Sequence, residues 1–273
     1  MSTLPLFTGL FAGVFEIILP IGLAIWLTRK FQVRWKVVWV GALAFVLAQA
    51  VHIPLLSVLT NAFKSGALPT PPASWAGVFN AILLGLLAGL FEETARVLAY
   101  RYLGKEARSW RAGVVLGVGH GGIESLALVG ITVLVSYAAL LVAQYAPGVI
   151  PSTQMQIELK AALGQPWHLP LAGAVERVSA MMIQISLSVV VLQAFLRRNA
   201  WWYGLAVLLH TLWDASVVLL TQAKLEVWAI EGIVLVMALI SLGILVALKP
   251  RQAEDMEVET GEAVSTHDQG REA

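Results

Sequence analysis

The 273-residue chain contains no cysteine, and only 13% of its residues are Asp, Glu, Lys or Arg. The absence of cysteine excludes a disulfide framework, a thiol nucleophile and a thiolate metal site. With 58% apolar residues and a mean hydropathy of +0.78, the composition is far from that of a soluble domain. The net charge of +1 gives no indication of a nucleic-acid partner. We therefore expect an integral membrane protein whose surroundings are the lipid bilayer.

Long apolar runs make up most of the sequence. Runs of about 20 residues, the length one helix needs to cross hydrocarbon, begin near seven positions: Leu4, Val37, Ala76, Ala112, Leu171, Trp201 and Trp228. None shows the alternating pattern of a barrel strand. The sequence predicts an all-α, polytopic membrane bundle of about seven transmembrane helices, with residues 1–250 as one transmembrane domain.

Basic residues gather in every second connection between these runs. They follow the first, third, fifth and seventh runs: Arg29, Lys30, Arg34 and Lys36; Arg101, Lys105, Arg108 and Arg111; Arg197 and Arg198; Lys249 and Arg251. The opposite connections carry only Lys64, Lys160 and Lys224. The positive-inside rule therefore predicts an N-terminus outside and a C-terminus in the cytoplasm. Residues 251–273 are acidic and nearly free of large apolar side chains, so we expect a disordered cytoplasmic tail there.

Ionisable side chains interrupt three of the runs at a spacing that places them on one helix face. The groups are Glu92 and Glu93 with Arg96, His120 with Glu124, and His210 with Asp214. Each charge in hydrocarbon costs about 2.5–3.5 kcal/mol on insertion scales, so such residues persist where they pair, line a cavity or do chemistry. Counted along each helix at 1.5 Å per residue, Glu93, His120 and His210 lie at one depth, roughly 12–14 Å below the cytoplasmic surface.

Two imidazoles and a carboxylate around one ion form the ligand set of a catalytic zinc site, with a fourth position for water. We predict Glu93, His120 and His210 as zinc ligands and Glu124 as a further candidate. The alternative is that His120–Glu124 and His210–Asp214 are satisfied pairs that only hold helices together.

The adjacent glutamates point about 100° apart on a helix, which indicates two different roles. Glu93 is the predicted ligand because its depth matches that of the histidines. Glu92 is the predicted general base, since Arg96 one turn away can hold it ionised and oriented. A structural Glu–Arg pair is the alternative reading of Arg96.

Small and single polar residues indicate how the helices pack. A stripe of small residues on the helix of His120 predicts that a neighbouring backbone approaches it closely; its members are Gly113, Gly117 and Gly121. Gln49, His52 and Gln184 are isolated polar residues in other runs, and interhelical hydrogen bonding is the usual role of such residues.

At these residues the chain resembles the YhfC family of intramembrane metalloproteases, which is itself similar to the wider group of CAAX-processing and bacteriocin-processing membrane proteases. The resemblance runs over nearly the whole apolar part, through Ile18–Gly22, Phe45–Gln49, His52–Pro54, Gly119–Glu124, Val175–Arg177 and His210. Its most specific element is Gly-His-Gly-Gly-Ile-Glu at 119–124. The resemblance implies a metal-dependent cleavage of a peptide or membrane-protein substrate.

The wider group carries Glu-Glu-x-x-x-Arg, Phe-x-x-x-His and His-x-x-x-Asn motifs, whose metal-binding and water-activating roles would fall here on the two glutamates and two histidines already named. The glutamate motif is one residue shorter in this chain, so with Arg96 as the fixed point Glu92 takes the place of the second glutamate. Leu116 stands where the wider group has Phe. Asp214 stands where it has Asn; an aspartate can ligate a metal, or stabilise an oxyanion only when protonated.

Together these patterns predict an intramembrane zinc metalloendopeptidase that cleaves its substrate near the cytoplasmic side. The alternative, from another class, is a proton- or cation-coupled transporter or a non-catalytic binding protein that uses the same Glu/His cluster as a relay. Transporters commonly show an internal repeat with matched broken helices. The first three and last three runs share no motif of that kind.

Overall fold

The computed structural model describes residues 2–146, 148–149 and 153–250, and the regular elements in these ranges are all helical. The helices are α1 (Leu4–Phe31), α2 (Trp35–Lys64), α3 (Ala76–Leu103), α4 (Trp110–Glu124), α5 (Ile131–Tyr145), α6 (Thr153–Gly164), α7 (Leu171–Leu196), α8 (Trp201–Gln222) and α9 (Val227–Ala247). Two short elements, η1 (Gly104–Ala107) and η2 (Ser125–Gly130), are a 3₁₀ and a π helix.

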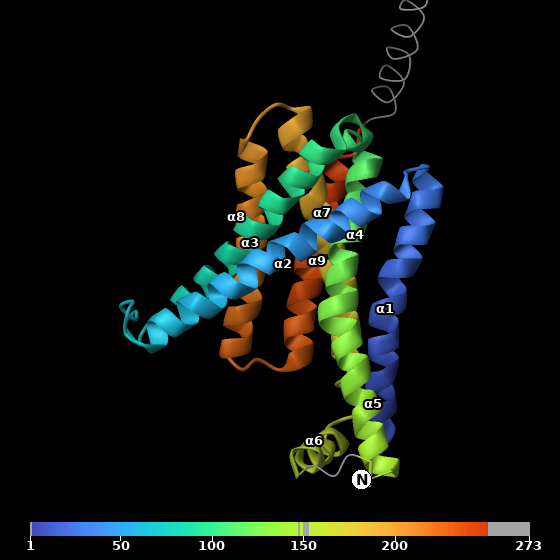
Figure 1. The fold of residues 1–273 in the computed structure, drawn as a ribbon, viewed down its shortest axis with the longest axis vertical. Coiled ribbons are helices and arrows are strands. Elements are labelled where there is room, and N and C mark those ends of the chain that lie inside the picture. Colours follow the sequence, from blue (N-terminus) through green and yellow to red (C-terminus); the bar gives the residue numbers. More distant parts are fainter. Residues whose placement is uncertain (1, 147, 150–152, 251–273) are drawn as a thin grey trace, which may run out of the picture.

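Within the described residues, seven helical segments are long and apolar enough to cross a membrane, which confirms the predicted number of spans. The described part of the chain is therefore a polytopic helical bundle (Figure 1). The acidic tail expected at residues 251–273 lies outside the described residues.

The fourth span is longer than the apolar pattern indicates. It runs for 36 residues from Trp110 to Tyr145 and contains the π-helical turn η2 between α4 and α5. At 1.5 Å per residue this is about 54 Å, well beyond the roughly 30 Å of a hydrocarbon core. Its last part lies beside α1 and reaches α6, past the turn between α8 and α9 (Figure 1). Single π turns often mark functional sites, and this one begins directly after Glu124.

The centre of the bundle is α4, which packs against α1, α2 and α7. The main contacts of α3 are with α8 and α2, and α9 packs mainly on α7. Figure 1 shows α2 crossing obliquely in front of α4, with α3 beside it. Because α2 and α7 each contact α3 and α4, the helices that carry the predicted site residues are held around one point.

Glycines allow the closest of these contacts. A Cβ atom at Gly119 would lie 2.1 Å from a backbone carbonyl oxygen of α2, and one at Gly85 would lie 2.6 Å from the carbonyl oxygen of Thr211 on α8. Within the predicted stripe, a Cβ at Gly117 would lie 2.6 Å from Ile185 Cα of α7. Side chains other than hydrogen would push these backbones apart, so the predicted close approach along the stripe is confirmed.

One end of the bundle carries the basic connections. The α1–α2 turn, η1 with the start of α4, the α7–α8 turn and the end of α9 all lie there (Figure 1). We call it the basic end. The opposite end holds α6 and the first residues of α1.

Candidate active site

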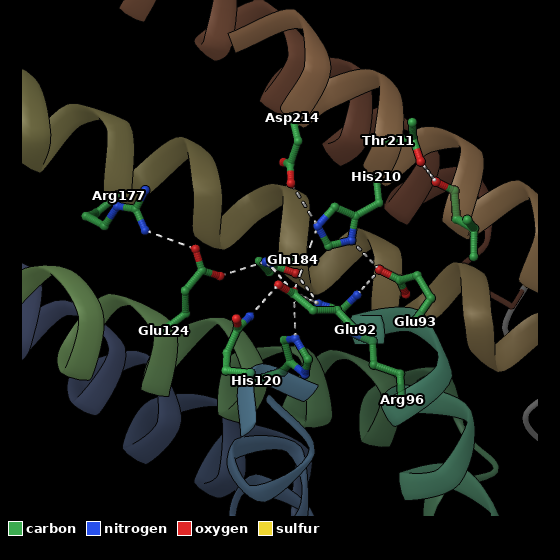
Figure 2. A network of polar contacts seen from close by, with 12 residues as sticks. Glu92, Glu93, Arg96, His120, Glu124, Arg177, Gln184, His210, Thr211 and Asp214 are labelled. Atoms are coloured by element: carbon green, nitrogen blue, oxygen red, sulfur yellow. Dashed lines mark hydrogen bonds and ion pairs between the residues drawn. The ribbon is translucent and has the colours of Figure 1, made fainter. Parts of the chain in front are cut away.

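Three helices bring the predicted acid–base residues together inside the membrane-spanning part of the bundle (Figure 2). Glu92 and Glu93 come from α3, His120 from α4 and His210 from α8. All four are buried, and none is more than 5% exposed. The common depth predicted from sequence therefore corresponds to a common location.

Glu92 faces both histidines. Its Oε2 atom lies 3.1 Å from His120 Nε2 and 3.9 Å from His210 Nε2. Its other oxygen accepts a hydrogen bond from Gln49 Nε2 on α2 at 3.0 Å. One carboxylate oxygen thus lies between two imidazole nitrogens that come from different helices.

Glu93 lies behind His210 instead of between the histidines. Its Oε1 atom is 2.6 Å from His210 Nδ1 and also accepts a hydrogen bond from Arg96. A carboxylate at Nδ1 fixes the orientation and tautomer of an imidazole and leaves the lone pair of Nε2 free. In this geometry the free Nε2 is the atom turned toward Glu92.

Arg96 is fully buried and supplies the positive charge of the cluster. It donates to Glu93 and to the side-chain oxygen of Gln184, and its Nη2 lies 3.9 Å from Glu92 Oε2. A buried guanidinium is tolerated only where acceptors surround it, because removing a charge from water costs several kcal/mol. Arg96 therefore offsets the negative charge of both glutamates, and of the two it hydrogen-bonds to Glu93.

Gln184 on α7 is a site residue that the sequence pattern identifies only as a packing contact. Its Nε2 donates to Glu124 Oε2 at 2.7 Å and to Glu92 Oε2 at 3.3 Å, while its oxygen accepts from Arg96. Both ends of the amide are thus used. No local sequence signal marks it, because the burial of α7, which has the largest buried share of all candidate spans in the described chain, follows from the packing of the other helices.

The remaining predicted residues lie at the edge of the cluster. Glu124 has no described contact with either histidine; it accepts from Arg177 Nη1 at 3.2 Å and from Gln184. Asp214 Oδ2 lies 3.5 Å from His210 Nε2, and its side chain is 44% exposed. The structure therefore brings Asp214 to the cluster directly and Glu124 only through Gln184.

A cavity of about 340 Å³ opens beside the cluster, between α3, α7, α8 and α9. His210, Asp214 and Gln184 line one part of it, and apolar side chains such as Leu84, Ile183, Trp213, Val218 and Met237 line the rest. The volume is at the lower end of the range for ligand pockets. One turn of an α-helix with a diameter of 10 Å occupies about 400 Å³, which is more than the volume of this cavity. The cavity therefore suits a short extended peptide segment.

The model of the YhfC intramembrane metalloprotease family matches residues 6–235, a range that includes every residue of the cluster. This chain belongs to that family. A Bacillus subtilis (strain 168) protein described as "Uncharacterized membrane protein YhfC" is 34% identical over 247 residues, which cover 85% of this chain and 91% of the relative. No solved structure matches the chain. The family and the seven apolar helices identify a multi-pass membrane protein.

The name of the YhfC metalloprotease family implies a metal ion, and the donor set can be compared with one. Two imidazoles and a carboxylate are typical of zinc and not of calcium or magnesium. Two atoms bound tetrahedrally at 2.0–2.1 Å lie about 3.3 Å apart, and the contacts of Glu92 Oε2 with His120 and His210, at 3.1 and 3.9 Å, bracket this value. As the side chains stand, no three His, Asp or Glu residues of the described chain are grouped closely enough to hold an ion. The residues fit zinc in type and in these two spacings.

Proposed function

We propose that this chain is a zinc-dependent intramembrane endopeptidase that cleaves a peptide or membrane-protein substrate. The observation that carries the proposal is the position of Glu92 Oε2 between the Nε2 atoms of His120 and His210 in a buried cluster that adjoins a cavity. These three residues would hold the ion. When bound, zinc polarises a water molecule and the scissile carbonyl group.

Glu93 and Arg96 have positioning roles in this proposal. Glu93 holds the His210 ring by its Nδ1 atom, and such a partner behind a ligating imidazole raises its basicity and fixes its direction. Arg96 offsets the negative charge of both glutamates. This partition reverses the one predicted from sequence, in which Glu93 is the ligand and Glu92 the base.

Asp214 is our candidate for the general base. A base must come within hydrogen-bonding reach of the water it deprotonates. Asp214 lines the cavity, is partly exposed to it and lies 3.5 Å from His210 Nε2. A water molecule that entered the cavity would therefore meet Asp214 next to His210.

The basic end faces the cytoplasm if the positive-inside rule holds for this chain. The cluster then lies roughly 12–14 Å from the cytoplasmic surface at 1.5 Å per helical residue. The cavity extends from the cluster away from the basic end, because its lining includes Glu176 near the start of α7 and Val234 in the first half of α9. A substrate segment in the cavity would occupy the half of the membrane opposite the basic end.

Metal analysis of the purified full chain tests the ligand assignment. We expect about one zinc per chain and its loss in the His120→Ala/His210→Ala double variant. The matched control is His52→Ala, because His52 is also buried and lines the cavity but has no described contact with Glu92. Equal zinc content in the wild type and the double variant would overturn the assignment, and zinc loss in the control alone would assign the metal elsewhere.

A cation- or proton-coupled transporter is a second candidate, and one observation favours it. Hydrogen bonds connect Glu176, through Arg177, Glu124 and Gln184, to Glu92. Figure 2 shows the inner part of this network. Its three carboxylates can each take up a proton, and buried carboxylates are common members of proton and cation pathways in membranes. Counterflow in reconstituted vesicles, without cleavage of any peptide, would favour transport over hydrolysis.

A further inference from the structure

A second and larger cavity lies at the basic end of the bundle, away from the candidate active site. Its volume is about 1000 Å³, and it is bounded by the α1–α2 turn, η1 with the start of α4, the end of α7 and the residues after α9. We call it the basic cavity. Its charged lining consists of five cations and one carboxylate: Lys30, Arg34, Arg108, Arg111 and Lys249, with Glu106.

Most of this positive charge has no carboxylate partner within the described residues. Glu106 contacts Arg34 at 3.4 Å and Lys36 at 2.8 Å. Three other cations of the cavity lie against aromatic rings: Lys30 on Trp26, Arg108 on Phe195 and Lys249 on Trp110. Like charges around one cavity repel each other, and an anion bound among them removes this repulsion.

Arg108 carries the clearest sign of a missing acceptor. Its Nη1 atom is buried and has no hydrogen-bond partner among the described residues. Burial also lowers the pKa of the Arg108 guanidinium, because the charged form loses hydration. The oxygens of a phosphate group match the planar fork of a guanidinium and would accept from this nitrogen.

Much of the rest of the lining is apolar, although Gln32 and Ser109 belong to it too, and this composition separates two possible sources of phosphate. Phe31, Val33, Val37 and Leu196 line the basic cavity together with the basic residues. The cavity lies where the candidate membrane spans end, and this is the level at which lipid headgroups are expected. Basic pockets between helices at this level bind anionic headgroups. An apolar lining favours a phosphate that brings acyl chains over a free, fully hydrated ion.

We propose that the basic cavity binds the phosphate of an anionic phospholipid, with Arg108 and Arg111 as its main contacts and Lys30 and Lys249 as further cations. This inference does not depend on the proposed peptidase activity. It assigns a ligand to a part of the bundle that shares no residue with the cluster around Glu92.

Lipid retention by the purified full chain tests the proposal. The protein is equilibrated in mixed micelles with phosphatidylglycerol or phosphatidylcholine, and the bound lipid is counted by native mass spectrometry. We expect phosphatidylglycerol to be retained over phosphatidylcholine. Each basic residue near an anionic headgroup contributes about fivefold in affinity, so Arg108→Gln/Arg111→Gln should weaken retention about 30-fold.

The matched control removes the same charge from the same end but outside the cavity. Arg101 and Arg198 are exposed and do not line it, so Arg101→Gln/Arg198→Gln should keep its lipid. Equal losses in the two double variants would overturn the proposal, since they would show a general attraction of the basic end. If the Arg108 variant does not fold, Lys249→Gln, at an exposed position, should still weaken retention about fivefold, and no change there would also count against the site.

A separate experiment distinguishes the phosphate of a phospholipid from free inorganic phosphate. Inorganic phosphate alone is added to the full chain in neutral detergent, and thermal unfolding is followed. We expect phosphatidylglycerol to raise the unfolding temperature and inorganic phosphate to leave it unchanged. An equal rise with both would assign the cavity to free phosphate and overturn the lipid proposal.

Discussion

The buried cluster and the basic cavity differ in how their charged side chains are paired. In the cluster, Arg96 hydrogen-bonds to Glu93 and Gln184 and lies 3.9 Å from Glu92 Oε2, so positive and negative groups are paired. In the basic cavity, Arg34 is paired with Glu106, and the other cations face aromatic rings or have no described carboxylate partner. The surroundings explain the difference. An unpaired charge inside hydrocarbon costs several kcal/mol, whereas water and lipid headgroups supply counter-ions where the helices end.

This comparison separates two kinds of information in a membrane protein. Charge at the ends of the helices reports on orientation and on the lipid surface. Charged side chains in the middle of the membrane must be paired with one another. The fold therefore fixes their positions as closely as those of the buried apolar side chains. Variants that remove one charge from each region should therefore differ strongly in effect.

Arg96→Met should have the largest effect on stability, because it leaves Glu92 and Glu93 buried without their cation. Breaking a buried ion pair from one side costs about 3–5 kcal/mol, so we expect a lower unfolding temperature and a lower yield in detergent. The control is Arg101→Met, an exposed residue of the same helix, for which we expect little change. Similar unfolding curves for Arg96→Met and the wild type would contradict the view that pairing holds the cluster together.

Asp214→Asn tests the carboxylate of the cluster that opens to the cavity. If Asp214 is the general base, turnover should fall about 10²- to 10⁴-fold while zinc content and unfolding temperature stay as in the wild type. Peptide cleavage by purified protein in vesicles measures the first quantity. Full activity in the variant would remove the base assignment, and would instead fit a role for residue 214 as a hydrogen-bonding neighbour of His210.

Variants of Glu92 and Glu93 test which of the two glutamates binds the metal. Glu92→Gln should lose zinc, because it changes the carboxylate that faces both histidines. Glu93→Gln should keep zinc but bind it about 10- to 100-fold more weakly, the usual effect of changing a partner behind a ligating imidazole. Competition with a chelator measures both affinities. The reverse order would restore the sequence-based assignment, with Glu93 as the ligand.

Much of the bundle and of its polar centre follows from local patterns in the sequence. Apolar length gives the spans, because a helix must cover the hydrocarbon core, and the structure confirms their number. Counting residues from the basic ends places Glu93, His120 and His210 at one depth, and the structure brings them together. These predictions succeed because each depends on a single helix.

The features of the site that the sequence does not indicate depend on how the helices are rotated relative to one another. Glu92 and Glu93 differ by about 100° around α3, and only the packing of α3 against its neighbours, which includes the close approach of Gly85 to α8, shows which of them faces both histidines. Gln184 joins the site for the same reason, since its side-chain hydrogen bonds are all with other helices. The basic cavity is likewise formed by segments that are distant in the sequence.

The smallest expected effect concerns the single carboxylate of the basic cavity. Glu106 pairs with Arg34 and Lys36 at the surface, and exposed pairs contribute little to stability. Glu106→Gln should therefore leave the unfolding temperature almost unchanged. It should nevertheless raise the retention of phosphatidylglycerol, by about fivefold if removing a negative charge acts like adding a basic residue near the headgroup. A carboxylate in the buried cluster would respond in the opposite way, with a large loss of stability. If Glu106→Gln destabilised the protein and bound no more lipid, then its pairs with Arg34 and Lys36 would be structural, and the two regions would handle charge alike.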